Sequence, residues 1–430
     1  MRAEHPVRME NVVCTFCGCL CDDIVVEVED NRITAVKKAC GHGKSLFLNA
    51  HTAARQPTID GKEVEWPLAI DTAAQVLTGA ANPLIYGLSS TASEAQRKAI
   101  ALADLLGATI DSTSSVCHGP STIGIQSQGE STCTLGEVKH RSDLVIFWGC
   151  NPAEAHQRHF ARYSVSARGK LTPRGRRDRT VVGVDVRPTA SFKRADIFLQ
   201  VRPGSDYEIL VTLRALLKGE ALDVTEVGGV SVRQLQDLVE RMKGCRFGVV
   251  FFGMGVTQTG GKAQNISELL TLVAELNAYT RFTAMAMRGH GNVAGIDLTL
   301  TWQTGYPFAV SLARGYPQYN PGEFTAVDVL ARKEADAALI IASDPVAHFP
   351  RQASQWLSQI PTIVLDPEEN LTAREARVFL PTAAYGISAA GTAYRMDNIP
   401  LPLKKLVESP RPTDEQVLDW IIERVKTCSG

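Results

Sequence analysis

Five cysteines lie within the first 40 residues, and four of these fall within eight positions of one another. Cys14, Cys17 and Cys21 make a C-x2-C-x3-C pattern, and Cys40 follows farther along the chain. One loop can wrap three corners of an iron–sulfur cubane while a distant cysteine closes the fourth. The spacing therefore predicts a 4Fe-4S cluster at Cys14, Cys17, Cys21 and Cys40, with Cys19 left as a non-ligand.

Zinc binding and disulfide bonding are two alternatives that stay open for these cysteines. Zinc also takes four thiolates, but structural zinc sites usually combine two C-x2-C knuckles rather than three clustered cysteines and one distant one. Disulfide bonds are less favoured, because a large chain without a signal-like N-terminus is expected to keep its thiols reduced. The pattern thus favours metal ligation, with the cluster ahead of zinc.

Two later loops carry side chains that could act on a small molecule. In residues 114–121, Cys117 and His118 stand side by side among small residues, and on an irregular loop both can face one ligand. In residues 285–292, glycines flank Arg288, whose guanidinium fork suits a carboxylate or a CO2-sized anion. Taken alone, the Cys117-His118 pair is better interpreted as a buried cysteine beside a hydrogen-bonded histidine.

Short apolar runs predict the scaffold that positions these loops. They alternate with helical stretches and show no strict apolar–polar alternation, which is typical of parallel strands buried on both faces. The expected strands are residues 83–87, 144–148, 180–184, 247–252, 338–342 and 362–365. Most of the chain is therefore expected to be α/β with doubly wound sheets.

Local signals add elements at both ends of the chain. Residues 24–28 and 32–36 are predicted to form a β-hairpin turning at Asp30-Asn31. Residues 91–94 match a capping box that would open a helix, and residues 266–276 indicate a second one. Thr413 and Asp414 are expected to cap a last helix that packs on the body or on a partner. Its apolar face is predicted to comprise Val417, Leu418, Ile421, Ile422 and Val425.

The overall charge excludes some classes of partner. Forty-five Lys and Arg side chains nearly balance 46 Asp and Glu side chains, so nothing favours nucleic acid or an anionic membrane. The basic residues 170–179 are expected to form a solvated loop rather than a docking element. No apolar run reaches the roughly 18–20 residues that span a bilayer, so we expect a soluble, cytoplasmic protein.

Taken in their order, the cysteine loop, Cys117-His118 and Arg288-Gly289-His290-Gly291-Asn292 resemble catalytic subunits of the molybdopterin oxidoreductase superfamily. The resemblance implies a 4Fe-4S cluster on the N-terminal cysteines, Cys117 as the ligand of tungsten or molybdenum, and Arg288 facing the substrate. His118 would be a proton carrier or a substrate-positioning donor. The implied cofactors are two molybdopterin guanine dinucleotides and a metal with a sulfido ligand.

Loops that follow the predicted strands also resemble this superfamily, and open α/β sheets bind nucleotides at such strand ends. Asp185 is implied as a guanine or ribose partner, whereas a fingerprint for NAD is absent. The residues implied in cofactor binding are Gly149, Asn151, Asp185, Arg187, Gly204, Asp206, Gly253, Gly255, Thr257, Gln258, Gly289, His290, Asn292, Ser343, Asp344 and Asp366.

Within the superfamily, residues 14–24 and 115–121 resemble the B subunits of formylmethanofuran dehydrogenases. This implies reduction of CO2 to formate with electrons from a ferredoxin-type donor, after which formate passes to a partner. The implied partners are an amidohydrolase-like A subunit, a C subunit, a β-barrel-like D subunit in place of a C-terminal β-barrel domain, and ferredoxin-like electron-transfer subunits. His42 departs from the lysine that many formate dehydrogenases carry between cluster and pterin.

The expected division of the chain follows from these signals. Residues 1–56 would form the iron–sulfur unit, residues 57–111 with 276–405 a first α/β domain, residues 112–275 a second one, and residues 406–430 a helix. Two alternatives to the function stay open: a plain formate dehydrogenase, and a cofactor-free scaffold of a formyltransferase/hydrolase complex. Neither metal, tungsten or molybdenum, is favoured by the residues.

Overall fold

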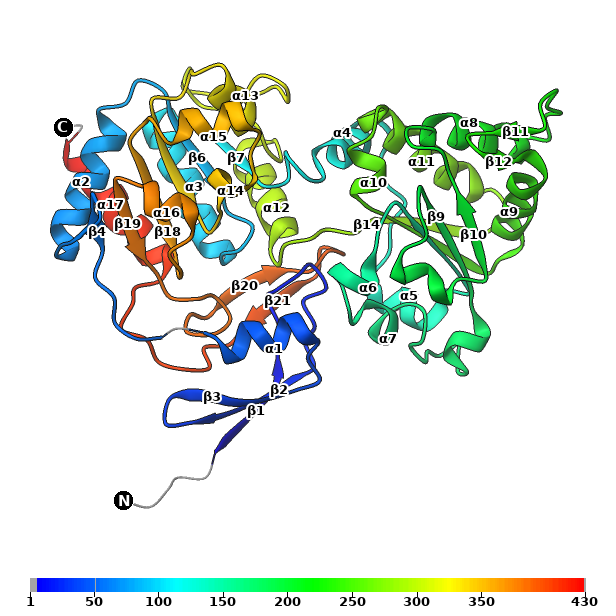
Figure 1. Ribbon diagram of the computed structural model, residues 1–430, viewed down its shortest axis with the longest axis horizontal. Coiled ribbons are helices and arrows are strands. Elements are labelled where there is room, and N and C mark those ends of the chain that lie inside the picture. Colours follow the sequence, from blue (N-terminus) through cyan, green and yellow to red (C-terminus); the bar gives the residue numbers. More distant parts are fainter. Residues whose placement is uncertain (1–5, 51, 429–430) are drawn as a thin grey trace. The chain divides into compact units, whose positions relative to one another are not determined.

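The computed structural model describes residues 6–50 and 52–428, and the chain forms two compact units (Figure 1). Unit 1 comprises residues 1–116, 290–395 and 400–430, and unit 2 comprises residues 117–289 and 396–399. The chain thus leaves unit 1 after Val116 and returns at His290. Of the predicted first and last domains, residues 1–5, 51, 429 and 430 lie outside the described residues.

Unit 1 is built on a nine-stranded sheet in the order β16-β15-β7-β6-β17-β18-β19-β4-β5. The strands from β7 to β19 run parallel, and the outer pairs are antiparallel. The strands are β4 (Thr58–Ile59), β5 (Lys62–Glu63), β6 (Pro83–Gly87), β7 (Thr109–Ser112), β15 (Val310–Ser311), β16 (Gln318–Tyr319), β17 (Ala337–Ile341), β18 (Thr362–Asp366) and β19 (Val378–Pro381).

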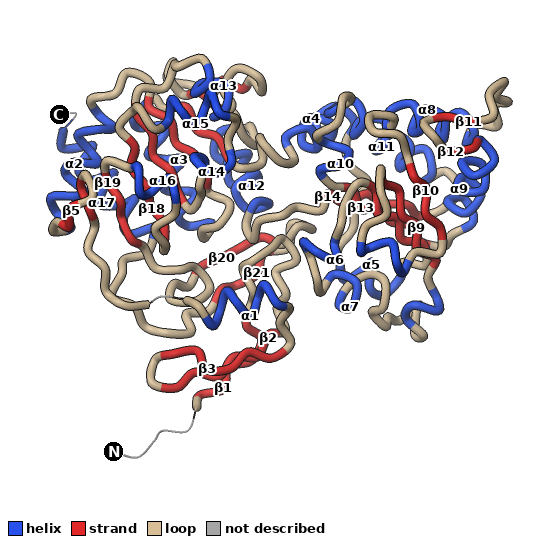
Figure 2. Tube along the Cα trace, viewed as in Figure 1, coloured by secondary structure: helices blue, strands red, loops and turns tan. Residues whose placement is uncertain are grey.

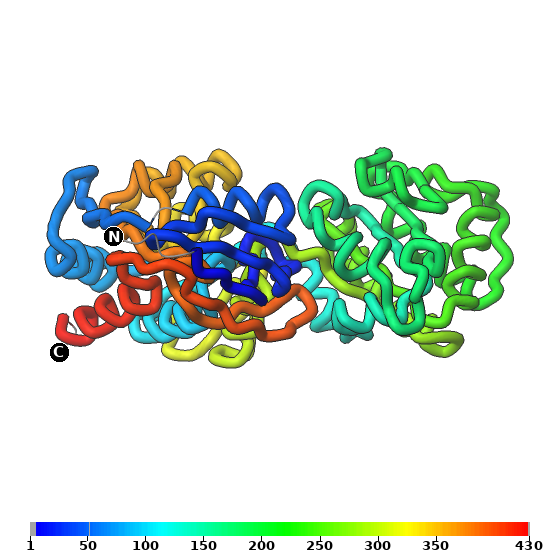
Figure 3. Tube along the Cα trace, turned by 90° about the horizontal axis from the view of Figure 1, so that it is seen from below, coloured from blue at the N-terminus to red at the C-terminus, as the bar shows by residue number. Residues whose placement is uncertain are grey.

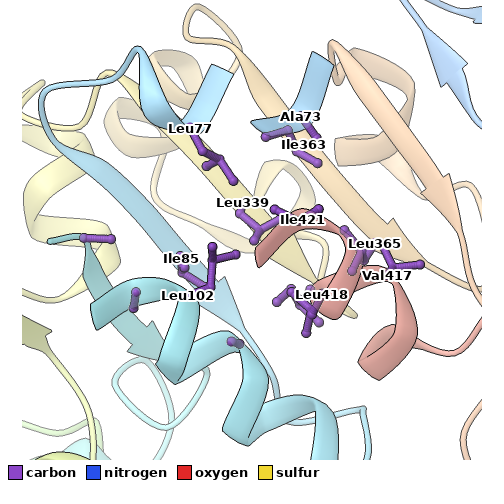
Figure 4. Close-up of a cluster of buried hydrophobic side chains, with 14 of the residues drawn as sticks. Ala73, Leu77, Ile85, Leu102, Leu339, Ile363, Leu365, Val417, Leu418 and Ile421 are labelled. Atoms are coloured by element: carbon purple, nitrogen blue, oxygen red, sulfur yellow. The ribbon is translucent and has the colours of Figure 1, made fainter. Parts of the chain in front are cut away.

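Helices cover both faces of this sheet (Figure 2). The first face buries α2 (Trp66–Thr78), α3 (Ser93–Leu106), α12 (Val293–Thr304) and α17 (Asp414–Cys428). The second face buries α13 (Ala326–Ala331), α15 (Arg351–Leu357) and α16 (Leu371–Glu375), with α14 (Pro345–His348) nearby. Along β17, Leu339 points to the first face and Ile340 to the second, as pleating requires. Figure 4 shows Leu339 among side chains of α2, α3 and α17.

The N-terminal part of unit 1 carries a separate three-stranded antiparallel sheet. It comprises β1 (Val7–Val12), β2 (Ile24–Glu29) and β3 (Arg32–Lys37), followed by α1 (Gly41–Leu48). Asp30 and Asn31 both have positive φ, which confirms the predicted hairpin turn. The hairpin of β20 (Gly391–Tyr394) and β21 (Pro400–Leu403) lies beside this segment (Figure 3). Leu20 packs with Ala393 and Leu403.

Unit 2 contains a five-stranded, fully parallel sheet in the order β10-β9-β8-β13-β14. Its strands are β8 (Leu144–Trp148), β9 (Thr180–Asp185), β10 (Ile197–Gln200), β13 (Phe247–Phe252) and β14 (Arg281–Ala286). The small hairpin β11 (Glu226–Val227) and β12 (Val230–Ser231) stands apart from the sheet. The helical segments are α4 (Gly119–Gln128), α5 (Leu135–Arg141), α6 (Pro152–Ala155), α7 (His159–Arg162), η1 (Gly175–Asp178), η2 (Ala190–Arg194), α8 (Asp206–Leu217), α9 (Val232–Gly244), α10 (Met254–Thr257) and α11 (Lys262–Leu276).

Each parallel sheet has one point at which the direction of strand addition reverses. In unit 2, β8 is followed by β9 and β10 on one side, whereas β13 and β14 add on the other side. In unit 1, β7 adds to one side of β6, and β17 to β19 add to the other. Loops at the carboxyl ends of the strands part at such points and leave a ligand crevice. We therefore expect a ligand to bind at the strand ends of each sheet, within its own unit.

The structure confirms the predicted strands to within one or two residues at their ends, and it corrects one helix cap. Ala92, rather than Thr91, is the N-cap of α3, and no side chain caps this helix. The Thr91 hydroxyl instead donates to Asp414, and Glu94 accepts from Thr392. Thr413 and Gln416 do form a reciprocal cap on α17, whose apolar side is buried in unit 1.

The boundary expected after residue 275 differs from the structure for a physical reason. β14 pairs in parallel with β13 and completes the sheet of unit 2, so this unit continues to Gly289. The final helix is likewise part of the core of unit 1 rather than a separate element. No helix in residues 6–50 and 52–428 combines the length and the apolar character that a bilayer crossing needs.

Most basic residues of the stretch 170–179 are exposed, as predicted for a solvated loop, but Arg179 is not. Arg179 is only 4% exposed. Its guanidinium donates to the carbonyl oxygens of Ser142, Ala167 and Lys139 and to the Thr172 hydroxyl. Buried carbonyl groups of irregular segments need donors, and the five-donor fork of arginine can serve several at once. Arg179 therefore holds the stretch against unit 2.

We expect Arg179→Met to lower the free energy of unfolding by about 3 kcal/mol, because several buried carbonyls lose their donor. The exposed neighbour Arg177 provides the control, since Arg177→Ala should change stability by less than about 0.5 kcal/mol. Urea unfolding of both variants measures the difference. Equal effects of the two substitutions would show that Arg179 does not anchor the stretch.

Candidate functional site

The four cysteines predicted as cluster ligands gather in unit 1. The Cys14 amide donates to the Cys21 carbonyl at 2.9 Å, which closes the loop, and Cys40 forms the N-cap of α1. Burial raises the pKa of Cys14, and the nearby Cys21, Cys17 and Cys40 add to this rise. A hydrogen bond from the Cys19 side chain lowers the pKa of Cys17. The thiols thus stand close enough to repel one another as thiolates.

The surroundings of these thiols fit a bound cluster. A Cβ placed on Gly43 would lie 3.0 Å from Cys14 Sγ and 3.9 Å from Cys40 Sγ, so only glycine leaves this side open. The Gly43 amide donates to Cys40 Sγ at 3.5 Å, which favours a thiolate there. None of the ten cysteines, all within the described residues, forms a disulfide bond.

The described residues hold no group of three His, Cys, Asp or Glu side chains set for a single metal ion. A 4Fe-4S cluster binds its four cysteines through four different irons, so its ligands stand farther apart than those of one ion. The four cysteines remain our predicted cluster ligands.

The Cys117 and Arg288 loops both belong to unit 2. Cys117 lies just before α4 and Arg288 just after β14, and both residues are half-buried. The Cys117 carbonyl accepts hydrogen bonds from the Thr257 hydroxyl at 3.0 Å and from the Gln258 amide at 2.9 Å. Thr257 and Gln258, which the sequence predicts at the cofactor, thus hold the backbone of the predicted metal ligand.

His118 links the two loops. Its Nε2 lies 3.2 Å from the Met287 carbonyl, which can only accept, so Nε2 carries the proton. The Ser121 hydroxyl then donates to Nδ1 at 2.9 Å. Burial, with the Arg288 charge as a second cause, lowers the pKa of His118 to about 3. The ring is neutral and both nitrogens are hydrogen-bonded within the protein. The role of His118 as a proton carrier or a substrate-positioning donor stays a prediction.

A second histidine, absent from the sequence prediction, contacts the next carbonyl along the Arg288 loop. His156 Nε2 lies 2.8 Å from the Arg288 carbonyl and donates to it, and the ring is 4% exposed. Burial lowers the pKa of His156. Its one signal in the sequence is position, because it follows the strand-end loop of β8 by a few residues.

Glu130 lies in the electrostatic field of the Arg288 side chain. Burial raises the pKa of Glu130 to about 7, and the Arg288 charge opposes this rise. Met287 continues the sheet by donating its amide to the Phe252 carbonyl at 2.8 Å. The loop that carries Arg288 is therefore a direct extension of β14.

Three glycines of the predicted cofactor loops pack against protein. Gly149 has φ of +56°, and a Cβ there would meet backbone atoms of Gly255 at 2.9 Å. A Cβ on Gly253 would meet Cys150 Cβ at 2.5 Å. Gly204 and Gly289 differ, because no atom lies within 4 Å of a Cβ built on either. Gly149, Gly253 and Gly255 thus let the β8 and β13 loops meet, whereas Gly204 and Gly289 leave open space.

The remaining predicted residues of unit 2 stand at the same edge of its sheet. Asp185 ends β9, and Arg187 beside it is exposed. Asp206 begins α8 and accepts from the Trp148 indole at 2.8 Å, while burial raises its pKa. Asn151 accepts from the Ser191 hydroxyl at 2.6 Å. Asp185, Arg187 and Gly204 therefore remain the best placed for an outside ligand.

Unit 1 gathers the other predicted residues. Cys17 forms an isolated antiparallel bridge with His290, and the Ser89 hydroxyl is hydrogen-bonded to His290 Nδ1 at 3.2 Å. Gly291 passes so closely that a Cβ would lie 2.0 Å from the Thr15 carbonyl oxygen. Asn292 is fully buried, accepts from the Tyr394 amide and donates to the Thr91 carbonyl. The segment after Arg288 is thus fastened to the cysteine loop by its own residues.

At the strand ends of unit 1, two predicted acidic residues cap local turns. Asp344 follows β17 and accepts from the Leu371 and Thr372 amides at the start of α16. Asp366 ends β18 and accepts from the Glu368 amide, and burial raises its pKa to about 7. The Ser343 carbonyl accepts from the Asn370 amide group. Ser343, Asp344 and Asp366 thus lie at the carboxyl ends of the neighbouring strands β17 and β18.

The order of the strands, the loops at their carboxyl ends and the N-terminal cysteine loop together are typical of one class of proteins. Residues 56–410 match the family model described as molybdopterin oxidoreductase, which is more than half of the chain. The structure resembles a chain of the formyltransferase/hydrolase complex FhcABCD of Methylorubrum extorquens, solved with methylofuran, with a TM-score of 0.72. The two sequences are 23% identical, and the match covers 87% of this chain and 99% of the other chain. This likeness shows the shared mixed α/β fold.

Two curated relatives narrow the family further. The chain is 49% identical to the B subunit of the tungsten-containing formylmethanofuran dehydrogenase 2 of Methanocaldococcus jannaschii, over 97% of this chain and 98% of that protein. It is 42% identical to the protein of the same name from Methanococcus maripaludis, over 97% and 98% of the two chains. The chain belongs to the molybdopterin oxidoreductase family, among the B subunits of formylmethanofuran dehydrogenases. Membership supports an oxidoreductase with a pterin–metal cofactor.

The glycine contacts predict two different substitution effects in unit 2. Gly149→Ala should lower the free energy of unfolding by about 3 kcal/mol or more, since the new methyl group meets backbone that cannot yield easily. Gly204→Ala, also at positive φ but in open space, should lower it by only about 1 kcal/mol. Urea unfolding checks the ranking, and a larger effect at Gly204 would contradict the packing of the two loops.

Proposed function

We propose that this chain is the catalytic subunit of a formylmethanofuran dehydrogenase that reduces CO2 to formate with two electrons. The names of the two curated relatives support this over a plain formate dehydrogenase. The observation that carries the proposal is the tie in unit 2 between the Cys117 loop and the Arg288 loop through His118. It keeps a thiolate ligand and an anion-binding arginine at a fixed distance within one unit.

The residues fit two molybdopterin guanine dinucleotides that hold tungsten or molybdenum, with a sulfido group as a further ligand. When bound, this centre supplies two-electron redox chemistry. Cys117 is the protein ligand of the metal. Asp185, Arg187 and Gly204 would take part in holding one dinucleotide in the crevice of unit 2, and Ser343, Asp344 and Asp366 the other in unit 1. Cys14, Cys17, Cys21 and Cys40 would hold the 4Fe-4S cluster through which electrons from a ferredoxin-type donor arrive.

Arg288 binds the oxygen atoms of the reacting molecule. Reduction of CO2 takes up two electrons and one proton and turns a neutral molecule into an anion. A guanidinium placed before the reaction stabilises this growing charge without reorganisation. The Nε2–H of His118 donates to the Met287 carbonyl and so joins the two loops. We therefore assign it the positioning of the Cys117 and Arg288 loops.

The product and the partners follow from the same assignment. Formate would pass to a partner protein that condenses it with methanofuran, a step for which we assign no residue in this chain. The relatives carry the name of a B subunit, which supports work within a multisubunit complex. We propose that the partners include amidohydrolase-like, β-barrel-like and ferredoxin-like subunits.

Metal analysis of the purified complex separates the catalytic proposal from the scaffold alternative. We expect iron together with tungsten or molybdenum, and we expect removal of the group 6 metal to abolish CO2 reduction while the iron remains. Elemental analysis by mass spectrometry makes the measurement. Absence of both iron and a group 6 metal from the active, natively purified complex would favour the cofactor-free scaffold.

Cys117→Ala tests the ligand assignment directly. Changes in the surroundings of a metal already reduce activity or metal affinity about 10- to 100-fold, so loss of a ligand should reduce CO2 reduction by about 100-fold or more. Cys428→Ala is the matched control, because Cys428 is exposed at the end of α17. Iron content should be unchanged in both variants. Full activity of Cys117→Ala with its group 6 metal still bound would refute the assignment.

A further inference from the structure

Two imidazole rings hold two consecutive carbonyl groups in the loop after β14. His118 donates to the Met287 carbonyl and His156 donates to the Arg288 carbonyl. The two histidines come from different parts of unit 2, one at the start of α4 and the other at the end of α6. Buried carbonyls on irregular backbone require donors, and here both donors are side chains rather than a neighbouring strand.

The backbone that bears Arg288 is fixed at every hydrogen-bonding group of this turn. The Met287 amide donates to the Phe252 carbonyl at 2.8 Å, and the Arg288 amide donates to the Ala286 carbonyl at 3.0 Å. The bond from His156 to the Arg288 carbonyl is the last contact before Gly289. A Cβ on Gly289 would meet no atom within 4 Å, so no other group packs where a side chain at this position would lie. His156 therefore limits how far the Arg288 peptide can move.

The position of His156 is itself set by the loop that follows β8. The His156 amide donates to the Pro152 carbonyl at 2.9 Å and closes the short helix α6. Ser191 fastens the other end of this helix, since its hydroxyl accepts from the Ala153 amide and donates to Asn151. The loop after β8, which we assign to the dinucleotide crevice, thus extends through His156 to Arg288.

The state of the ring suits this task. His156 is 4% exposed, and burial lowers its pKa, so the imidazole is neutral at ordinary pH. A neutral imidazole has one N–H, and the Arg288 carbonyl can only accept, so that N–H is at Nε2. A neutral His156 ring also adds no second positive charge beside the Arg288 guanidinium.

We propose that His156 is a positioning residue for Arg288, which sets where the guanidinium meets the oxygens of a formate-sized anion. The inference deepens the proposed function and rests on it. A residue with this role acts on binding of the anion rather than on the metal or on the fold of unit 2. Its removal should therefore change the affinity for formate more than the turnover number.

The test uses the purified complex and its formate oxidation with an artificial electron acceptor. His156→Leu keeps the bulk of the ring but has no donor, and we expect the KM for formate to rise about tenfold, which corresponds to loss of about one hydrogen bond. The turnover number per bound metal should change by less than about twofold. His156→Gln places an amide N–H at the same reach and should restore KM to within about twofold of wild type.

A matched control removes a buried side-chain bond to a carbonyl elsewhere in the same sheet. The Thr283 hydroxyl donates to the Gly248 carbonyl within unit 2, and Thr283→Val deletes that bond at nearly constant volume. Both Thr283→Val and His156→Leu should lower thermal stability, but only His156→Leu should change KM. Titration of the melting temperature with formate gives its Kd without turnover, and this Kd should weaken about tenfold in His156→Leu alone.

The possible results distinguish a failure of the positioning role of His156 from a failure of the proposed function. An unchanged KM and Kd in His156→Leu, or an equal rise in Thr283→Val, would overturn the positioning role while the wild-type complex still oxidises formate. A fall in turnover number at constant KM would overturn it as well, because the defect would then lie at the metal. A wild-type complex that holds its metal but neither oxidises formate nor reduces CO2 would overturn the proposed function instead.

Discussion

Irregular backbone at the ends of parallel strands has to find hydrogen-bond partners outside the sheet, and the candidate site of unit 2 is organised by that constraint. The carbonyl groups of Cys117, Met287 and Arg288 accept hydrogen bonds from side chains rather than from a neighbouring strand. Side chains replace the missing strand, with Thr257 and Gln258 at the Cys117 carbonyl and two histidines at Met287 and Arg288. These bonds fix the backbone of Cys117, of Arg288 and of its neighbour Met287.

The same constraint explains why several residues that look like cofactor ligands are engaged with the protein. Gly149 and Gly255 allow two strand-end loops to approach within contact distance, and a crevice could not form beside them if either loop were displaced. Asn292 uses its amide on the backbone of Thr91 and Tyr394 in unit 1. A residue of a family motif can therefore stabilise the loops of a site without contacting the ligand. Gly204 and Arg187 differ, because they are open to the surroundings.

Much of this organisation could be predicted from residue order alone. Apolar runs predicted the central strands because both faces of a parallel strand are buried, and Asp30-Asn31 predicted a turn because both residues tolerate positive φ. Contacts between distant segments could not be predicted in the same way. The Thr91–Glu94 box lost its partners to Asp414 and Thr392, about 300 residues away. Nothing local marks Arg179 as buried or His156 as the donor to Arg288, because each role depends on which carbonyl the fold brings near.

The chain leaves unit 1 at Val116 and returns at His290. This path affects the order in which the two units can fold during synthesis. All five strands of the sheet of unit 2 lie within residues 144–286, whereas β6 must pair with β17, more than 200 residues later. During synthesis, the sheet of unit 2 can close before the ribosome has delivered the middle strands of unit 1. A folded insertion shortens the effective loop that β6 and β17 must close, because only its two ends remain to be joined. Cys117 begins this insertion and Arg288 is its last residue but one. The hydrogen bond from His118 to Met287 therefore holds the two ends of the insertion close together within unit 2.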